Sequence, residues 1–170
     1  VIDDEDPRMA VVSQGGLFGY ADLEQGRLLL PPVYQDAGPF HEGLAVVRLG
    51  DRFGLIDRDG VWRIDCGRYD YVGPLSGGRA LVRRDGLYGF IDRHGREAIA
   101  VRYPFACRFH EGRAVVRIGD KYGYIDTEGR QAIPPVFDRA YRFIGGKARV
   151  NRCGETFFID KSDECWLKFD

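Results

Sequence analysis

Hydrophobic residues along this chain recur in short alternating runs, and the pattern of runs repeats at a fixed interval. Its clearest signature is an aromatic residue, a glycine, a variable residue, isoleucine or alanine, and an aspartate. Copies occupy residues 18–22, 53–57, 88–92 and 122–126, and a degraded copy occupies 156–160, so successive closing aspartates are 35, 35, 34 and 34 residues apart. A constant interval of this length predicts a tandem repeat array.

Each repeat unit is predicted to be a short antiparallel meander. A strand rich in β-branched residues, such as 44–48, leads into a two-residue turn, such as Gly50-Asp51, and then into the signature strand. An Asp-x-x-Gly turn and a third strand follow, and a connecting segment with an aromatic residue leads to the next unit. No part of the chain shows sustained helical periodicity.

The two-residue turn determines which residues face each other across the first two strands. In three units the count places an arginine of the first strand opposite the signature aromatic of the second. The pairs are Arg48 with Phe53, Arg83 with Tyr88, and Arg117 with Tyr122. We expect each guanidinium to lie against the facing ring, a contact that contributes roughly 0.5–1 kcal/mol at exposed sites.

These elements predict an all-β fold, a tandem repeat array of about 4.5 antiparallel hairpin or meander units of 34–35 residues. One repeat domain spans residues 1–170, and its acidic segment 1–7 is expected to be a mobile N-terminus. The array is expected to be an open twisted solenoid. A propeller-like disc is the alternative, because a small rotation per unit separates the two. The approximate units are 8–39, 40–74, 75–108, 109–142 and 143–170.

Composition narrows the function. A hydrophobic content of 44% supports a folded core, and the formal net charge of −1 argues against nucleic-acid binding, which needs a basic surplus. No apolar run approaches the ~18 residues that a membrane-spanning helix needs. The four cysteines and three histidines form no metal-binding motif, and no nucleophile–base motif is present. We therefore expect no metal, no cofactor and no enzymatic activity.

The repeated aspartates are better explained by turn chemistry than by catalysis or calcium binding. Calcium needs several oxygen ligands converging on one ion, whereas each unit supplies a single aspartate at a turn. Aspartate at the first position of a type I turn accepts hydrogen bonds from backbone N–H groups. We interpret as turn caps the residues Asp22, Asp57, Asp92, Asp126 and Asp160.

One candidate partner-binding feature is a row of arginines. Arg48, Arg83 and Arg117 occupy equivalent positions and would form a basic stripe suited to an acidic partner. A solvated or ring-stacked brace on the sheet is the simpler interpretation, because isolated surface charges contribute little.

Two histidines and a tryptophan are the other candidates for partner binding. His41 and His110, each followed by glutamate, recur at equivalent positions two units apart. We expect them to be exposed loop residues, since only strong curvature would bring the two pairs together. Trp166 would either help to cap the open edge of the last unit or anchor a partner.

Once aligned, the units resemble the bacterial tryptophan-glycine (WG) repeat family. The match covers residues 8–160, and the segments 40–43 and 109–112 fit its Phe-x-Glu-Gly element closely. Every signature tryptophan is replaced by phenylalanine, tyrosine or threonine, and the two tryptophans, Trp62 and Trp166, lie elsewhere. The resemblance implies a β-rich interaction repeat that is often attached to other domains and brings no catalytic residues.

The cysteines and the first residue are the features that bear on the cellular compartment of the protein. We expect the cysteines to be free thiols. The alternative is a disulfide between Cys153 and Cys165, which flank the last copy, in an oxidising compartment. The chain starts at Val1, which a removed signal peptide or a chosen sequence boundary would explain equally well. We favour the bacterial cytoplasm, and a signal peptide before Val1 would instead indicate the periplasm or secretion.

These observations favour a non-enzymatic module that binds another protein. A specific form is an inhibitor, such as an immunity protein that neutralises a bacterial toxin, and another is the recognition part of a larger polypeptide. The alternative is a carbohydrate or cell-wall ligand-binding module that uses its aromatic-rich faces for stacking. An enzyme is the least favoured class, because no set of catalytic groups is apparent.

Overall fold

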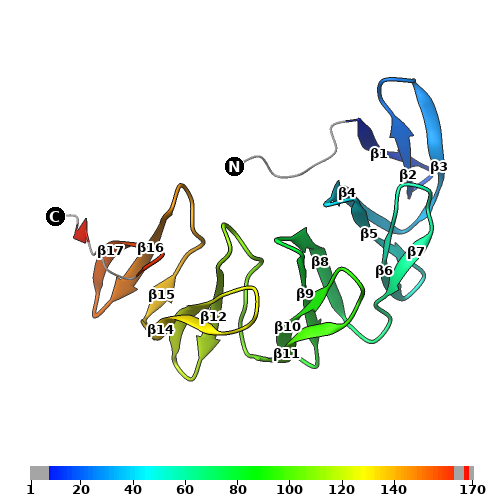
Figure 1. Ribbon diagram of the computed structural model, residues 1–170. Coiled ribbons are helices and arrows are strands. Elements are labelled where there is room, and N and C mark those ends of the chain that lie inside the picture. The colour runs from blue at the N-terminus through cyan, green and yellow to red at the C-terminus, as the bar shows by residue number, and fades with distance from the viewer. Residues whose placement is uncertain (1–7, 163–166, 169–170) are drawn as a thin grey trace.

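The computed structural model describes residues 8–162 and 167–168 of the 170-residue chain. This part of the protein is all-β, and its strands form five small antiparallel sheets in tandem. The sheets follow one another along an open arc, with the first and the last at opposite ends (Figure 1). The predicted all-β repeat array is confirmed, and its curvature is that of an open, propeller-like arc. The described residues contain no helix that could span a membrane.

The strands are numbered in chain order, sheet by sheet. The first sheet contains β1 (Met9–Gln14), β2 (Leu17–Asp22) and β3 (Arg27–Tyr34). The second contains β4 (Asp36–His41), β5 (Leu44–Leu49), β6 (Arg52–Ile56) and β7 (Trp62–Asp65). The third contains β8 (Tyr71–Ser76), β9 (Arg79–Arg84), β10 (Leu87–Asp92) and β11 (Glu97–Tyr103). The fourth contains β12 (Ala114–Ile118), β13 (Lys121–Ile125) and β14 (Gln131–Phe137). The fifth contains β15 (Arg139–Ala140), β16 (Lys147–Arg152), β17 (Glu155–Asp160) and β18 (Leu167–Lys168).

The segment that connects one unit to the next is itself part of a sheet, which the three-stranded prediction did not include. It crosses to the following sheet and supplies that sheet's first strand as β4, β8 and β15. Just before β8, Asp70 N donates a hydrogen bond to the Arg83 carbonyl at 3.0 Å. In the fourth sheet the same segment forms isolated bridges, such as Ala106 with Val116. Pairing satisfies backbone groups that a buried connector would otherwise leave without partners.

The predicted hairpin register is confirmed in three units. The facing pairs are Arg48 with Phe53, Arg83 with Tyr88, and Arg117 with Tyr122. In the turn between β9 and β10, Asp85 and Gly86 both have positive φ, 53° and 78°. Two positive φ values give a two-residue turn the twist of its flanking strands, so the local turn chemistry sets the register of the whole hairpin.

The hydrophobic core is divided into four layers, each lying between two neighbouring sheets. In three layers, the ring at the variable signature position of one sheet meets the phenylalanine that precedes the next unit's first long strand. The ring pairs are Tyr20–Phe40, Phe90–Phe109 and Tyr124–Phe143, with centroids 4.9, 4.8 and 5.1 Å apart. All six rings are at most 1% exposed. Leu55 and Leu75 are the corresponding residues of the remaining layer.

The signature aromatics themselves are only half-buried. Phe53, Tyr88 and Tyr122 occupy equivalent positions and pack against the edges of three layers, as the repeat predicts. In three units the ring at the variable position two residues later, Tyr20, Phe90 or Tyr124, is therefore more deeply buried than the aromatic that defines the signature.

The expected stacking of arginines on these aromatics is wrong. Arg83 Nε donates to Asp70 Oδ1 at 3.0 Å, and Arg117 Nε donates to the Gly119 carbonyl at 3.0 Å. The cation–π contacts of the described residues involve other arginines, such as Arg149, whose guanidinium lies 4.2 Å from the centroid of a tyrosine ring. Carboxylate and carbonyl oxygens thus lie within reach of Arg83 and Arg117, and a charge-assisted hydrogen bond is stronger than contact with a ring face.

The signature glycine has no room for a side chain. A Cβ on Gly123 would lie 2.7 Å from the Ile133 carbonyl oxygen and 2.8 Å from the Pro135 nitrogen. Gly123 lies where the ladder between β13 and β14 shifts its register, so that the third strand crosses close over the second. The atoms in the way belong to the backbone, which cannot rotate aside.

We expect Gly123→Ala to lower the free energy of unfolding by about 1–3 kcal/mol, because the added methyl group must displace backbone. Urea unfolding followed by circular dichroism measures this change. Gly38→Ala is the matched control, since the nearest atom to its Cβ, the Val46 oxygen, is 3.7 Å away. Equal destabilisation by the two substitutions would contradict the steric explanation.

Candidate interaction surface

The glutamates of the Phe-x-Glu-Gly turns link each of two sheets to the sheet that follows. The Glu42 carboxylate accepts hydrogen bonds from Gly78 N at 3.0 and 3.2 Å. The Glu111 carboxylate accepts from Gly145 N at 2.7 Å and from Gly146 N at 2.9 Å. The prediction of exposed loop residues is therefore wrong for these glutamates, because the arc brings the next two-residue turn within hydrogen-bonding distance.

The environment of Glu111 favours its charged form. The hydrogen bond from Gly146 N, a second from Gly145 N, and the nearby Lys161 ammonium hold the pKa of this carboxyl below its ordinary value, against the opposing effect of desolvation. Glu111 is thus an ionised cap for the turn of the fifth sheet.

The same turns line a single hollow of about 610 Å³, here called the turn hollow. Its lining comes from the second to the fifth sheets and includes His41, Ser76, His110 and Ile144. His41 and His110 therefore line one hollow, which the sequence indicated only for a strongly curved array, and the arc in Figure 1 has that curvature. Among the described residues, no group of three or more His, Cys, Asp or Glu is placed to hold a metal ion.

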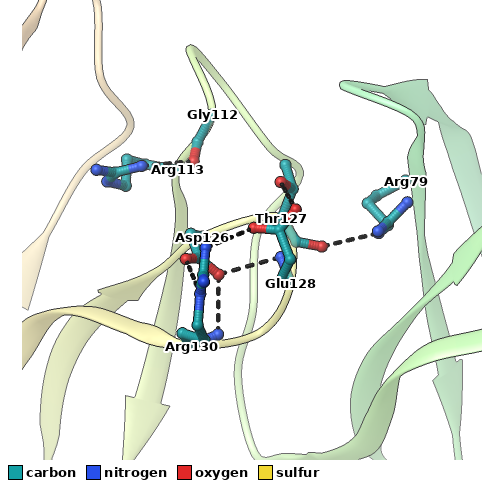
Figure 2. A network of polar contacts seen from close by, with 7 residues as sticks. All are labelled: Arg79, Gly112, Arg113, Asp126, Thr127, Glu128 and Arg130. Carbon is teal, nitrogen blue, oxygen red and sulfur yellow. Dashed lines mark hydrogen bonds and ion pairs between the residues drawn. The ribbon is translucent and has the colours of Figure 1, made fainter.

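Further hydrogen bonds join the third and fourth sheets. Ser76 Oγ donates to the Phe109 carbonyl at 2.7 Å, and Arg79 Nε donates to the Thr127 carbonyl at 2.9 Å (Figure 2). Arg113 is the equivalent of Arg79 in the next unit. It donates through Nη1 to the Gly112 carbonyl at 3.1 Å, and its buried Nε has no hydrogen-bond partner in the described part of the chain. Arg79 Nε thus links the third sheet to the fourth, and Arg113 Nε makes no equivalent hydrogen bond in the described part of the chain.

The predicted aspartate caps are confirmed. In one turn, Asp92 Oδ1 accepts hydrogen bonds from His94 N at 2.8 Å and Arg96 N at 2.9 Å. Desolvation would raise the pKa of the Asp92 carboxyl, but these backbone hydrogen bonds hold it below its ordinary value. Figure 2 shows the equivalent cap, Asp126, in the next unit. Equivalent hydrogen bonds to turn N–H groups are made by Asp22, Asp57 and Asp160.

A larger groove, of about 880 Å³, adjoins the turn hollow and shares four lining residues with it. It extends from segment 105–110, beside the fourth sheet, to segment 140–149 of the fifth, and we call it the basic groove. Phe105, Tyr141 and Ile144 line it and are 40%, 42% and 66% exposed. Its positively charged lining residues are Arg108, Arg142, Lys147 and Arg149. A groove lined by exposed apolar side chains together with charged residues is typical of interaction sites.

The repeat units match the sequence pattern of a known protein family. Residues 18–52, 53–88, 88–122 and 122–152 each match the sequence pattern of the WG containing repeat. The chain belongs to the WG-repeat family. The resemblance seen in the sequence is thereby confirmed, although phenylalanine or tyrosine stands where the signature tryptophan of these repeats is expected. No curated protein sequence matches this chain.

Solved structures match the WG-repeat arc in fold alone. A eukaryotic initiation factor matches with a TM-score of 0.60 and 10% identity, over 94% of this chain and 52% of that chain. Hsv2 of Kluyveromyces lactis, a propeller-like structure, matches with a TM-score of 0.56 and 8% identity, over 96% of this chain and 60% of that chain. This WG-repeat chain thus spans less than two thirds of either structure, and identities this low carry no functional information.

The predicted arginine stripe lies apart from the turn hollow and the basic groove. Its members are Arg48 on β5, Arg83 on β9 and Arg117 on β12. None of them lines either hollow. Arg83 and Arg117 form ion pairs with Asp70 and Asp120. The partner-binding role of the stripe remains a prediction, and these ion pairs favour a brace on the sheet.

The C-terminal features are only partly described. Trp166 and Cys165 lie outside the described residues, so the proposed anchor and the disulfide with Cys153 remain predictions. β18 pairs antiparallel with β17, with Lys168 facing Phe157 and Leu167 facing Phe158. Residues 167–168 therefore supply an edge strand of the fifth sheet.

The basic groove was missed at the sequence level, although the WG repeats carry a readable signal for it. In the second and third sheets, Gly-Pro precedes the buried Phe40 and Leu75. At the same places before the long strands of the fourth and fifth sheets stand Cys107-Arg108 and Tyr141-Arg142. A departure shared by two adjacent units marks residues that the fold itself does not require, and such residues are candidates for function.

We expect Asp92→Asn to destabilise the protein more at neutral pH than in acid. The pKa of the Asp92 carboxyl is lower in the folded state than its ordinary value of 3.8, so the ionised cap stabilises the fold at pH values above 3.8. This stabilisation is lost as the pH falls through the lower folded-state pKa. Urea unfolding at about pH 7 and about pH 3 measures the change. Asp59→Asn, at an exposed position of another turn, is the control. An equal effect of Asp92→Asn at both pH values would contradict the ionised cap.

We expect Glu111→Ala to lower the melting temperature, since two turn N–H groups of the fifth sheet lose their acceptor. Differential scanning calorimetry measures the change. Glu24→Ala, at an exposed turn position of the first sheet, removes the same charge and serves as control. Indistinguishable melting temperatures for the two variants would show that Glu111 does not help to hold the fifth sheet.

Proposed function

We propose that this WG-repeat protein is a non-enzymatic module that binds another protein through the turn side of its arc. The observation that carries the proposal is the continuity of this surface. Segments from four successive sheets line the turn hollow, and the basic groove adjoins it. A repeat array gains an extended binding surface in this way, because each unit adds equivalent positions to it.

The state of the reactive side chains supports a non-enzymatic role. The turn aspartates are occupied by backbone hydrogen bonds. Burial, and to a smaller extent the charge of Asp65, raises the pKa of the Cys66 thiol to about 12. Burial also raises the pKa of the Cys107 thiol. Neither cysteine resembles an activated nucleophile, which needs a lowered pKa.

The finer form of the proposal is an inhibitor, such as an immunity protein that neutralises a bacterial toxin. The recognition part of a larger polypeptide is the other form. Compact size and a surface that crosses several units support an inhibitor, since a standard interface buries only about 800 Å² on each partner. Carbohydrate binding remains the second candidate, because the exposed rings of Phe105 and Tyr141 would serve as stacking platforms.

The test begins with capture of a host protein by the immobilised chain, followed by calorimetry with the purified partner. We expect Arg108→Glu, which alters a residue common to both hollows, to weaken this binding by about tenfold or more. Arg27→Glu, at an exposed position of β3, makes the same charge change outside both hollows and should have no effect. Arg83→Ala should also leave affinity unchanged, which would eliminate the arginine stripe.

Each alternative has its own outcome in this test. A captured toxin whose activity the array suppresses supports the inhibitor. Glycan-array binding without a protein partner supports the carbohydrate alternative and contradicts the main proposal. Hydrolysis of a substrate by the partner-free protein, lost in His110→Ala, would overturn the non-enzymatic assignment.

A further inference from the structure

The basic groove combines an apolar interior with charge of a single sign. Phe105 and Tyr141 present exposed rings, and Ile144, 66% exposed, adds an aliphatic side chain. Exposed bulky apolar side chains are costly in water, and their grouping in one groove indicates a binding site rather than scattered surface residues.

In the described part of the chain, the basic groove is lined by cations and by no Asp or Glu. Glu42 and Glu111 line the adjoining turn hollow, where each accepts hydrogen bonds from turn N–H groups. Within the described chain, the ion pairs include neither Arg108, Arg142 nor Lys147. Arg149 lies over the Tyr141 ring at 4.2 Å. The whole chain carries 25 basic and 26 acidic residues, so the groove concentrates positive charge on an otherwise balanced protein.

Comparison of the units shows that this charge is an addition to the repeat. The position of Arg149 is apolar in the three preceding units, where Val46, Leu81 and Val115 pack in or against the layers between sheets. Arg108 and Arg142 likewise stand where the earlier units have proline, at Pro39 and Pro74. The fold is built without these arginines in the second and third units, so folding alone does not explain them.

We propose that the basic groove binds an acidic protein segment that places a bulky apolar side chain against Phe105, Tyr141 and Ile144. Carboxylates of the segment lie against Arg108, Arg142, Lys147 and Arg149. The apolar contact provides the anchor, since large buried side chains carry most of the free energy of such interfaces. The charges provide orientation and exclude basic partners. This inference rests on the proposed protein-binding function and specifies the chemistry of the partner.

A nucleic acid fits these observations less well. Phosphate backbones are bound by extended basic tracts, whereas here four cations share the lining of one groove with apolar side chains, on a chain of net charge −1. A segment with both carboxylates and a bulky apolar residue matches both properties of the groove at once.

The test is selection from a phage-displayed library of random dodecapeptides on the full chain. We expect enriched peptides with an excess of Asp and Glu around a bulky apolar residue. Their affinity, measured by fluorescence anisotropy, should fall about tenfold or more when that residue becomes alanine. The double substitution Arg142→Glu with Arg149→Glu should have an effect of similar size, and so should Ile144→Asp. Rising salt should weaken binding, because partly exposed charges are screened.

Controls make each outcome decisive. Arg27→Glu should bind the peptides as the wild-type protein does, and circular dichroism should show the same fold for all variants, which change exposed residues. No enrichment, enriched peptides without an acidic excess, or peptides insensitive to the groove variants would overturn the inference. A thymidine oligonucleotide that binds as tightly as the peptides and is lost in the double variant would also overturn it. The proposed function fails separately, when the wild-type chain captures no host protein.

Discussion

Contact between the rings of successive sheets is the interaction on which the rest of this structure depends. A sheet of three or four short strands cannot bury its own faces, so it needs a neighbour. Tyr20 on Phe40, Phe90 on Phe109 and Tyr124 on Phe143 provide this neighbour contact at nearly equal centroid distances, 4.9, 4.8 and 5.1 Å. Such ring pairs contribute about 0.5–1.5 kcal/mol each beyond the apolar area they bury. Because every layer is made by two adjacent units, stability is shared along the arc rather than concentrated in one core.

Polar contacts repeat with the same spacing and complement these layers. Within a unit, aspartates such as Asp92 cap the turn that follows the signature strand. Between units, Glu42 and Glu111 cap the equivalent turn of the next sheet. Apolar contacts thus hold the faces of neighbouring sheets together, while carboxylates fix the turns along one side. This division leaves the turn side polar and regular, and it is there that the hollow forms.

The two ends of the array differ in the residues that precede the buried apolar residue of each sheet. The second and third sheets carry Gly-Pro before their buried apolar residue, whereas the segments before the long strands of the fourth and fifth sheets carry an arginine there. The basic groove lies at these later units. A tandem array can change a few positions in one unit without disturbing the others, since each unit contacts only its neighbours. The same independence explains how binding chemistry can be localised in an otherwise uniform fold.

Much of the architecture could be predicted from the sequence, because it depends on turns formed by residues that are neighbours along the chain. The interval of 34–35 residues, the hairpin register at Gly50 and Asp85, and the aspartate caps all depend on residues close together along the chain. Two-residue turns and Asp-x-x-Gly turns have few allowed geometries, so their identity predicts pairing directly. The sequence did not predict that Arg83 pairs with Asp70 instead of stacking on a ring. Asp70 lies beside Arg83 because the connector pairs with β9 as strand β8, and that strand was not predicted.

By itself, the sequence determined the repeat, the strand pairing inside each hairpin and the family. Tertiary structure alone decided the curvature, which depends on a small rotation at each layer that accumulates over the array. That curvature places His41 and His110 on one hollow and brings Glu111 to the turn at Gly145 and Gly146, 34 and 35 residues away. It also brings Phe105 and Tyr141 to one groove. Contacts of this range follow from how the sheets pack, and no local pattern encodes them.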